Sequence, residues 1–342
     1  RSGRESSAKE DAMIRVEDLR AGYPTGFRRV WREILSGVSF EVPKGSITGY
    51  LGVNGAGKTT TIKVLVGINS PSGGKATIDG NPTGTPAAQR LLGYFPEAPF
   101  FYDSLNGREL LDFYGKLAGM ERAERRTRAE LLLDEVGLGH AKDVAVKGYS
   151  KGMRQRLGLA QALVGDPQVL ILDEPLDGLD PMGRLHLRSL IERQREAGRT
   201  VFFSSHVLSD VEAVSDHLVV IDGGKVAYAG STEGISAGEE RVDVEVEAPI
   251  AMREDLEALA GTSLEQKSAP DNERCRYEAL CSDTAGAEAL VKAVLAGEGR
   301  LLAYSRRRQS LEEVFLARFG DQGQAPTGDP APAAPAGEGA SS

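Results

Sequence analysis

The spacing of apolar and polar positions divides the chain into two regions. In residues 13–238, short apolar segments alternate with longer stretches of helical periodicity. The segments VLIL and VFF are apolar on both faces, which is typical of central strands in a parallel sheet. This region therefore predicts an α/β domain. We expect strands at Ser46–Leu51, Val169–Leu172, Thr200–Ser204 and Leu218–Asp222.

The pattern changes in residues 239–320, which predict a small accessory α+β domain. A ferredoxin-like topology is one arrangement that fits this order of elements. The flanking residues 1–12 and 321–342 lack a hydrophobic period, and we expect a flexible tail and a disordered Pro/Ala/Gly-rich tail. In the domain we expect strands at VDVEVE, CRYEAL and LLAYSR, helices at Arg253–Ala260 and Thr284–Leu295, and a last helix through SLEEVFLARF.

Charge and composition narrow the classes of function. The net charge of −9 speaks against nonspecific binding of nucleic acid, which needs a basic face, so we expect no nucleic-acid partner. No apolar run approaches the ~18–20 residues that span a bilayer. Cys275 and Cys281 have the spacing of neither a redox pair nor a zinc site, and we expect them to be packing residues.

A glycine-rich segment, GVNGAGKTT, follows the first predicted core strand. Its pattern Gly-x-x-x-x-Gly-Lys-Thr, between a strand and a helix, is that of a phosphate-binding P-loop. Glycines permit backbone angles that a Cβ forbids, so N–H groups can converge on a phosphate. The alternative is a glycine-rich turn with an incidental lysine. We expect nucleotide contacts from Gly52, Asn54, Gly55, Ala56, Gly57, Lys58, Thr59 and Thr60, with the Thr59 hydroxyl also binding Mg²⁺.

Two carboxylates, Asp173 and Glu174, follow the apolar strand VLIL. Ligands of open α/β sheets bind at the carboxyl ends of the strands. Asp173 is expected to hold Mg²⁺, and Glu174 to polarise the attacking water as a general base. Taken alone, the segment could equally be a strand that is followed by a charged turn. Its place downstream of a P-loop favours the catalytic interpretation.

Three further segments indicate which kind of P-loop protein this is. In YSKGMRQRLGLAQAL, Ser150 and Gly152 begin a helix and can form a second anion site, although an ordinary capped helix is the alternative. The segment DGLDP contains Asp180 and follows the carboxylates directly. His206 follows another apolar strand, where it could meet a γ-phosphate or serve only a structural role.

Together these segments resemble the ATP-binding cassette (ABC) family over residues 14–230. The resemblance implies that two cassettes dimerise head to tail around two ATP molecules. Ser150 and Gly152 would then bind the γ-phosphate held by the opposite protomer, Asp180 would lie in the turn that couples the two sites, and His206 would be the switch histidine. Tyr23 falls where the family stacks an aromatic ring on adenine, but its spacing also fits a strand or core tyrosine.

The chain departs from the family pattern at two places. The family signature LSGGQ reads YSKGM here, so that Lys151 adds a charge near the phosphate. Glu97 stands where a glutamine normally contacts Mg²⁺, and we expect it to be a metal ligand. The PE form at this position, and the later SLEEVFLARFG, resemble the drug- and antibiotic-export subgroup, whose ATPase and permease are separate chains.

The resemblance therefore implies an ATPase subunit of a bacterial exporter that uses ATP and Mg²⁺. Its expected partners are a second protomer, as a homodimer, and a separate polytopic permease at the cytoplasmic face of the plasma membrane. We expect docking of the permease at Ala98–Leu105 and at the helix GRELLDFYGKLAG, unless these aromatic residues fill the cassette's own helical subdomain. One alternative is a nontransport cassette that acts on a soluble or nucleic-acid partner. The other is a regulatory protein in which ATP is a ligand rather than a substrate, and Glu174 and His206 speak against it.

The segment Thr25–Leu35 lengthens the connection after Tyr23. It interleaves Arg28, Arg29 and Arg32 with apolar residues, including the only tryptophan, Trp31. Such a mixture could contact nucleotide bases and phosphates or lipid headgroups. The tip of a long hairpin is the alternative.

Overall fold

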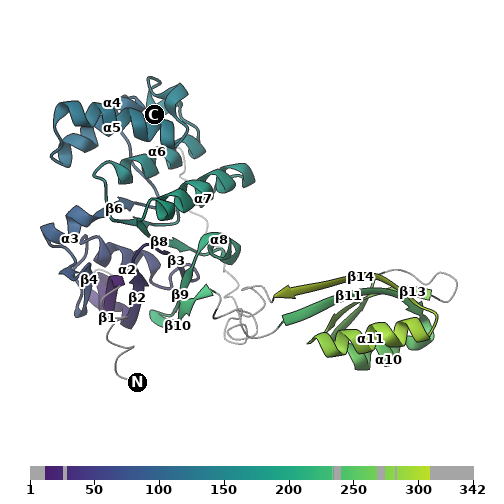
Figure 1. Cartoon of the computed structure of the whole chain (residues 1–342). Helices are drawn as coiled ribbons and strands as arrows, with labels where there is room; N and C mark the ends of the chain where they lie inside the picture. Colours follow the sequence, from purple (N-terminus) through teal and green to yellow (C-terminus); the bar gives the residue numbers. More distant parts are fainter. Residues whose placement is uncertain are drawn as a thin grey trace, which may run out of the picture. The chain divides into compact units, whose positions relative to one another are not determined.

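The computed structural model describes residues 12–25, 29–232, 234, 240–267, 274–281 and 283–308. It divides the chain into two compact units, one ending at Glu240 and the other beginning at Arg241 (Figure 1). The predicted helix through SLEEVFLARF lies outside the described residues. Among the described helices, none combines the length and the apolar character needed to cross a bilayer.

The core of the first unit is a six-stranded sheet in the order β10-β9-β3-β8-β7-β6. The pairs from β9 through to β6 are parallel, and β10 is antiparallel to β9. Strands β3, β7 and β8 are buried along their whole length, as the apolar runs predicted. The α/β prediction is confirmed. The strands are β3 (Ile47–Leu51), β6 (Leu92–Phe95), β7 (Val169–Leu172), β8 (Thr200–Ser205), β9 (His217–Asp222) and β10 (Lys225–Ser231).

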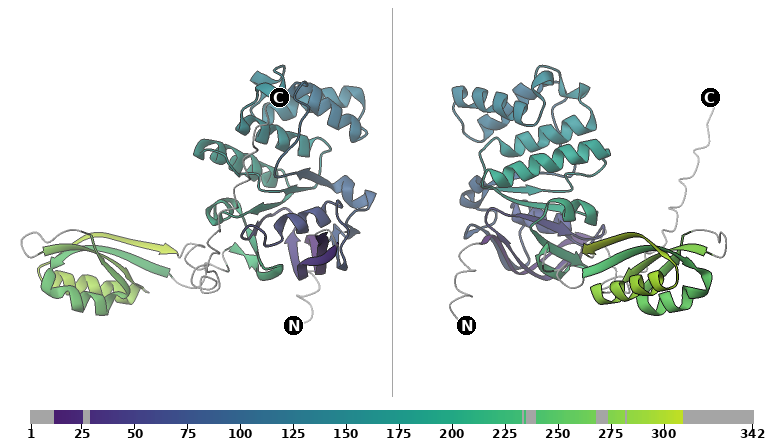
Figure 2. Two further views of the ribbon diagram at one scale, coloured as in Figure 1. Left: turned by 180° about the vertical axis from the view of Figure 1, so that it is seen from behind. Right: turned by 45° about the vertical axis from the view of Figure 1, so that its right-hand side comes forward.

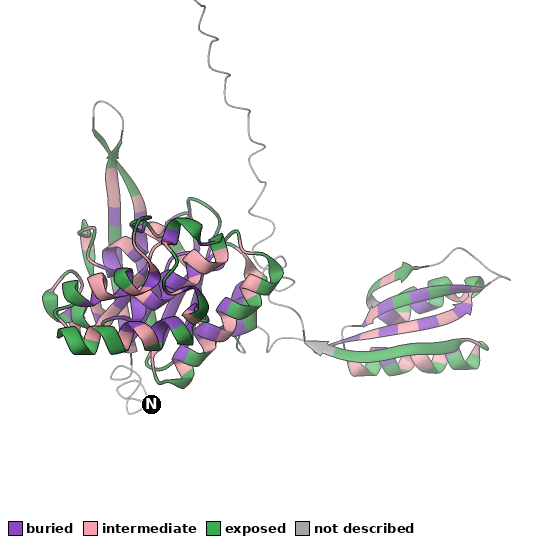
Figure 3. Ribbon diagram, turned by 90° about the horizontal axis from the view of Figure 1, so that it is seen from above, coloured by how far each residue is buried: buried purple, intermediate pink, exposed green. Residues whose placement is uncertain are grey.

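A second, antiparallel sheet in the order β2-β1-β4-β5 completes this unit. Strands β1 (Ala12–Thr25) and β2 (Val30–Pro43) form a long hairpin, joined by β4 (Gly73–Ile78) and β5 (Asn81–Pro82). Thr25 pairs with Val30 and Tyr23 with Arg32, so the arginine-rich segment forms the outer end of this hairpin. The residues near its turn are exposed, green in Figure 3. Of the three arginines, Arg28 lies outside the described residues.

Helices pack around the sheets and form a helical subdomain at one end of the unit. In both views of Figure 2, as in Figure 1, α4, α5 and α6 lie together on the side away from the antiparallel sheet. Helix α4 begins at a capping box in which Asn106 and Glu109 satisfy each other's backbone N–H groups. The helices are α2 (Lys58–Leu65), α3 (Pro86–Leu91), α4 (Gly107–Leu117), α5 (Arg122–Glu135), α6 (Lys151–Leu163), α7 (Pro181–Glu196) and α8 (Leu208–Val214), with short 3-10 turns η1 (Gly139–Ala141) and η2 (Val146–Gly148).

The second unit has the ferredoxin-like order of elements, strand-helix-strand-strand-helix-strand. Its four-stranded sheet runs β12-β13-β11-β14, and both long helices cover one face of it (Figures 1 and 2). Strand β12 was not predicted, because its segment GTSLEQ contains a single large apolar residue. Cys275 and Cys281 are buried in the core. The elements are β11 (Glu240–Pro249), η3 (Ile250–Met252), α10 (Arg253–Ala260), β12 (Gly261–Gln266), β13 (Arg274–Cys281), α11 (Thr284–Ala296) and β14 (Arg300–Arg308).

Candidate functional site

The predicted site residues follow neighbouring strands of the central sheet. The P-loop follows β3, His206 follows β8, Asp173 follows β7, and Glu97 lies two residues beyond β6. These four strands are adjacent and parallel. Their carboxyl ends therefore meet at one edge of the sheet, which brings together residues that are up to 154 positions apart in the sequence, from Gly52 to His206.

The P-loop between β3 and α2 depends on glycines with positive φ angles. Gly55 has φ 85° and Gly57, which precedes the first residue of α2, has φ 115°. A Cβ on Gly57 would lie 2.6 Å from a methyl group of Leu35. Glycine is thus required here both by backbone conformation and by close packing. The first N–H groups of α2 point out of the helix at this end, where they can bind an anion.

Lys58 is buried beneath the loop and makes contacts on two sides. Its Nζ donates to the carbonyl oxygen of Gly52 at 2.6 Å and forms an ion pair with Glu174 Oε1 at 3.2 Å. The side chain is 6% exposed. Because ammonium groups are costly to bury without a partner, these contacts hold the charge at the loop. A phosphate that entered the loop would compete with Glu174 for this ammonium group.

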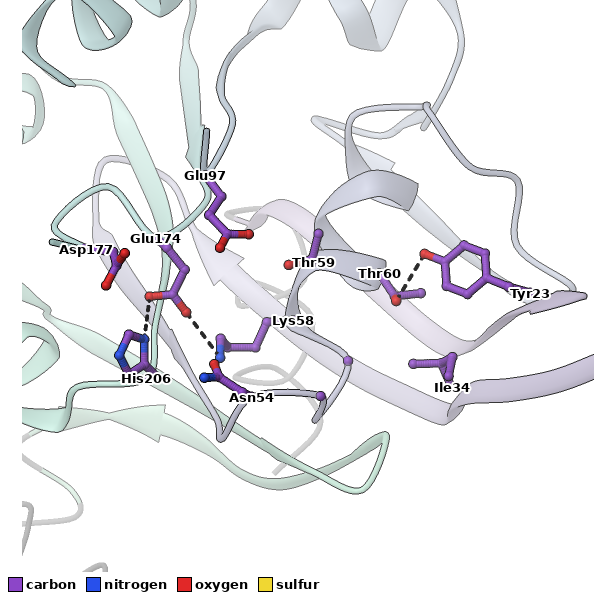
Figure 4. A pocket seen from close by; sticks show the side chains of 12 residues that line it. Tyr23, Ile34, Asn54, Lys58, Thr59, Thr60, Glu97, Glu174, Asp177 and His206 are labelled. Atoms are coloured by element: carbon purple, nitrogen blue, oxygen red, sulfur yellow. Dashed lines mark hydrogen bonds and ion pairs between the residues drawn. The ribbon is translucent and has the colours of Figure 1, made fainter. Parts of the chain in front are cut away.

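Glu174 lies close to Lys58 and His206 in Figure 4, with dashed lines to both. Its second carboxylate oxygen, Oε2, lies 3.0 Å from Nδ1 of His206. Its backbone has φ 46°, in the left-handed region that few residues other than glycine adopt. The Glu174 N–H donates to the Ser204 hydroxyl at 2.9 Å, and that hydroxyl donates to Asp173 at 2.7 Å. Ser204 thus fixes both carboxylate residues, and sequence reasoning did not identify it.

Asp173, the first residue after β7, is 1% exposed. Burial raises the pKa of its carboxyl, the nearby charges of Glu97 and Glu174 raise it further, and hydrogen bonds from Ser204 and Thr59 oppose the shift. Burial, together with the charges of Asp173 and Glu97, also raises the pKa of Tyr94 to about 12. The site therefore holds an excess of negative charge, which a cation would relieve.

The chemistry of these donors fits Mg²⁺. Within the described residues, no group of three or more His, Cys, Asp or Glu side chains is arranged as a complete metal site. Mg²⁺ usually binds through only one or two carboxylates, together with substrate phosphates and water. Asp173 and the Thr59 hydroxyl that bonds to it, with Glu97 nearby, provide such an incomplete set of oxygen ligands.

A cavity of about 390 Å³ connects these groups. Tyr23 lies at one end, where its hydroxyl donates to Thr60 Oγ1 at 3.1 Å and accepts from Asn69 at 3.0 Å. Asp177 and His206 lie at the other end (Figure 4). Of the predicted residues, Gly52, Ala56 and Asp173 support the cavity without lining it. The lining residues are Tyr23, Ile34, Asn54, Gly55, Gly57, Lys58, Thr59, Thr60, Glu97, Glu174, Asp177 and His206.

Three predicted residues lie in a second cavity, of about 780 Å³. Ser150 caps α6 by accepting the N–H of Met153 at 3.2 Å. Asp180 caps α7 by accepting the N–H of Gly183 at 2.9 Å. Gly152 and Lys151 also line this cavity. The structure therefore separates the P-loop cavity from the cavity at the start of α6.

Asp177 and Ile34 line the first cavity but were not predicted. Asp177 opens the segment DGLDP, so a search for carboxylates near Glu174 could have found it. Ile34 lies on β2 (Val30–Pro43), the strand that precedes β3 and the P-loop in the sequence and belongs to the other sheet. No local pattern marks Ile34, because its position depends on how the hairpin packs against the central sheet.

Comparison with known proteins explains this arrangement. A family model for ABC transporters matches residues 35–177, from β2 to Asp177. An uncharacterised ABC transporter ATP-binding protein of Synechocystis is 38% identical over 315 residues, which cover 91% of this chain and 86% of that protein. The chain belongs to the ABC transporter ATPase family. It is therefore an ATP-binding ATPase. The drug-export subgroup that the sequence resembled is supported by relatives named for drug resistance.

One further relative and one solved structure are also similar to this ABC ATPase. The daunorubicin resistance ATP-binding protein DrrA3 of Streptomyces coeruleorubidus is 33% identical over 300 residues, covering 85% of this chain and 92% of that protein. The solved structure of cbiO1 from Clostridium perfringens, part of the ABC transporter complex cbiONQ, has a TM-score of 0.59 and 30% identity, covering 67% of this chain and 92% of that one.

Proposed function

We propose that this ABC ATPase is the energy-supplying subunit of a bacterial exporter, which dimerises around two Mg-ATP molecules and drives a separate membrane permease. The observation that carries the catalytic part is the placement of Glu174 between Lys58 and His206, at 3.2 and 3.0 Å. A carboxylate in this position is poised to act as a base beside the terminal phosphate of a nucleotide in the P-loop.

The nucleotide would change the partners of these groups. Its phosphates would accept from the N–H groups at the start of α2 and from Lys58, which would leave Glu174. The freed carboxylate could then orient a water and accept its proton, while His206 contacts both Glu174 and the γ-phosphate. Thr59, Asp173 and Glu97 would hold Mg²⁺, which neutralises phosphate charge when bound. Tyr23 stands at the far end of the cavity, where a base would lie.

Dimerisation is supported by the second cavity. Ser150 and Gly152 lie at the start of α6, outside the cavity of their own P-loop. Helix N-termini favour anions, and one nucleotide needs only one P-loop. We therefore propose that the second cavity faces the γ-phosphate of ATP held by another copy of this chain, with Asp180 at the contact between the two sites.

Coupling to a permease is supported by an exposed surface after Glu97. Phe100 is 83% exposed and Tyr102 is 53% exposed, whereas Phe101 is buried at 3%. Phe101 is thus packed inside the unit, whereas Phe100 and Tyr102 leave an exposed aromatic surface that supports the proposed docking of a permease. Phe113 of α4 packs edge-on against Tyr102. We infer export and a place at the cytoplasmic face of the membrane from the resemblance to the drug-export subgroup, and the name of the daunorubicin resistance ATP-binding protein supports this inference.

The variant Glu174→Gln tests the central assignment. It keeps the size of the side chain and removes the base, so we expect hydrolysis to fall by roughly 10²–10⁴-fold while ATP still binds. The ATP-bound dimer should accumulate and be seen by light scattering with Mg-ATP but not without it. Glu196→Gln, an exposed position on α7, is the matched control. Hydrolysis at the parent rate in Glu174→Gln would overturn the role of Glu174. Co-purification with a polytopic membrane protein tests the partner.

A further inference from the structure

An ion pair connects the P-loop cavity with the cavity at the start of α6. Lys151 lines the second cavity and Asp177 lines the first, and Lys151 Nζ lies 4.0 Å from Asp177 Oδ2. In the sequence the two residues are 26 positions apart, one at the first position of α6 and the other in the turn before α7. Each cavity therefore contributes one charge to a contact that spans both.

Gly178 makes this contact possible. It has φ 61°, and a Cβ at this position would lie within 1.8 Å of Lys151 Nζ and 2.9 Å of Lys151 Cε. The lysine side chain therefore lies across the backbone of the turn, in space that only a glycine leaves open. Its ammonium group thus faces Asp177, while Lys151 itself lines the second cavity together with Ser150 and Gly152.

The ion pair between Lys151 and Asp177 is weak enough for Lys151 to change its partner. Both side chains are about half exposed, at 58% and 49%, and the N–O distance of 4.0 Å is at the limit of an ion pair. Exposed pairs of this kind contribute little and are screened by salt. A phosphate offers an ammonium group several charged oxygens and a stronger hydrogen bond. Lysine suits such a change of partner, because it is a compact charge on a flexible stem.

We propose that Lys151 and Asp177 form an exchangeable ion pair that links the two nucleotide-facing cavities of a protomer. Asp177 holds Lys151 while the second cavity is empty, and Lys151 transfers to the terminal phosphate of the ATP bound by the other protomer when the dimer closes. Asp177 is then a positioning residue that competes for Lys151. This inference rests on the proposed dimer.

The experiment measures the dissociation constant of the dimer at saturating Mg-ATP, by light scattering or sedimentation. Every protein carries Glu174→Gln, so that ATP is retained. We expect Lys151→Met to weaken the dimer by roughly tenfold or more, the usual effect of losing a hydrogen bond to a charged group. Lys151→Arg should restore it, because the charge is kept. Lys147→Met, an exposed lysine on η2 that does not line the second cavity, should have no effect.

Asp177→Asn tests the competition. Removing the competing carboxylate should tighten the dimer by up to about fivefold, the range of an exposed ion pair. In the Lys151→Met background, Asp177→Asn should leave the dissociation constant of the dimer unchanged, because there is no ammonium group left to release. The effect of Lys151→Met on the dimer should shrink at high salt and should be absent with ADP, which lacks the terminal phosphate.

Failure of the proposed dimer and failure of the Lys151–Asp177 exchange give different results in these measurements. If the Glu174→Gln parent remains monomeric with Mg-ATP, the proposed dimer is wrong. A parent that dimerises normally, with Lys151→Met equal to Lys147→Met, would overturn the phosphate contact of Lys151. If Asp177→Asn tightens the dimer equally with and without Lys151, the exchange is wrong, because Asp177 would then act on the nucleotide directly.

Discussion

At the scale of a single residue, Glu174 has two features that cost free energy in the folded state. Its backbone lies in the left-handed region, at φ 46°, and its carboxylate is buried beside Asp173. Backbone strain of this kind costs about 1–3 kcal/mol and is retained only where the surroundings enforce it. Here the Ser204 hydroxyl holds the Glu174 N–H, and Lys58 and His206 hold the carboxylate. The strain aims the carboxylate into the cavity, which supports a chemical rather than a structural use.

A second prediction for a single residue concerns Glu97, whose charge raises the pKa of Asp173. Glu97→Gln removes this charge. The pKa of Asp173 should fall, so its carboxylate would stay ionised to lower pH, and the acid limb of the ATPase profile should move to lower pH. Half-maximal rate should need more Mg²⁺, since one carboxylate is lost. We expect a loss of rate below about tenfold, less than the loss of a general base.

A Mg²⁺ titration of the ATPase rate at several pH values measures both effects. Glu41→Gln, on β2 and away from the cavity, removes a carboxylate of the same kind and controls for net charge. Superimposable curves for the parent and Glu97→Gln would place Glu97 away from the metal, as a solvated or permease-facing residue.

The P-loop illustrates how one element depends on the packing of another. Gly57 has a positive φ and lies against Leu35 of β2, whereas Gly55 has a positive φ and open space around it. The loop is therefore shaped both by its own backbone and by the hairpin that covers it. The two glycines allow the effect of conformation to be separated from the effect of packing.

We expect Gly57→Ala to destabilise the first unit more than Gly55→Ala. Both substitutions introduce backbone strain of about 1–3 kcal/mol. Only Gly57→Ala also forces a methyl group to within 2.6 Å of Leu35, so that β2 or α2 must shift and ATP affinity should fall further. Thermal unfolding and ATP titration measure the two effects. Equal losses for both variants would mean that Leu35 moves aside freely.

At the scale of the whole molecule, each unit has its own hydrophobic core. The core of the first unit joins both of its sheets, including Phe40, Tyr50 and Phe202. The core of the second is formed by β11, β13 and its two helices, with Val244, Tyr277 and Leu290. Units with separate cores can unfold separately. Every residue of both cavities belongs to the first unit.

Leu290→Ala should therefore lower the melting temperature of the second unit without changing ATP affinity. Removing a fully buried leucine costs roughly 2–5 kcal/mol. ATP distinguishes the two unfolding transitions in a calorimetric scan. It raises the melting temperature of the first unit, which binds it, and leaves that of the second unit unchanged. The matched variant Leu190→Ala, fully buried in α7, should lower the ATP-sensitive transition instead. Weakened ATP binding in Leu290→Ala would show that the units depend on each other.

The sequence by itself determined the features that are encoded in contiguous residues. The P-loop, the carboxylates after VLIL and the α/β alternation are local patterns, and each depends on backbone geometry and burial over a few positions. The second unit was predictable for the same reason, except for β12, because GTSLEQ has too few apolar residues to indicate a strand.

Only the tertiary structure decided which residues meet. Lys58, Glu174 and His206 come together because β3, β7 and β8 lie in one sheet with their carboxyl ends aligned. Packing between elements likewise decides three other features of the site. They are the positions of Ser204 and Ile34, the burial of Phe101 beside exposed Phe100, and the contact of Lys151 with Asp177. Such contacts are set by the register of strands and by which helix covers them, and no local pattern specifies either.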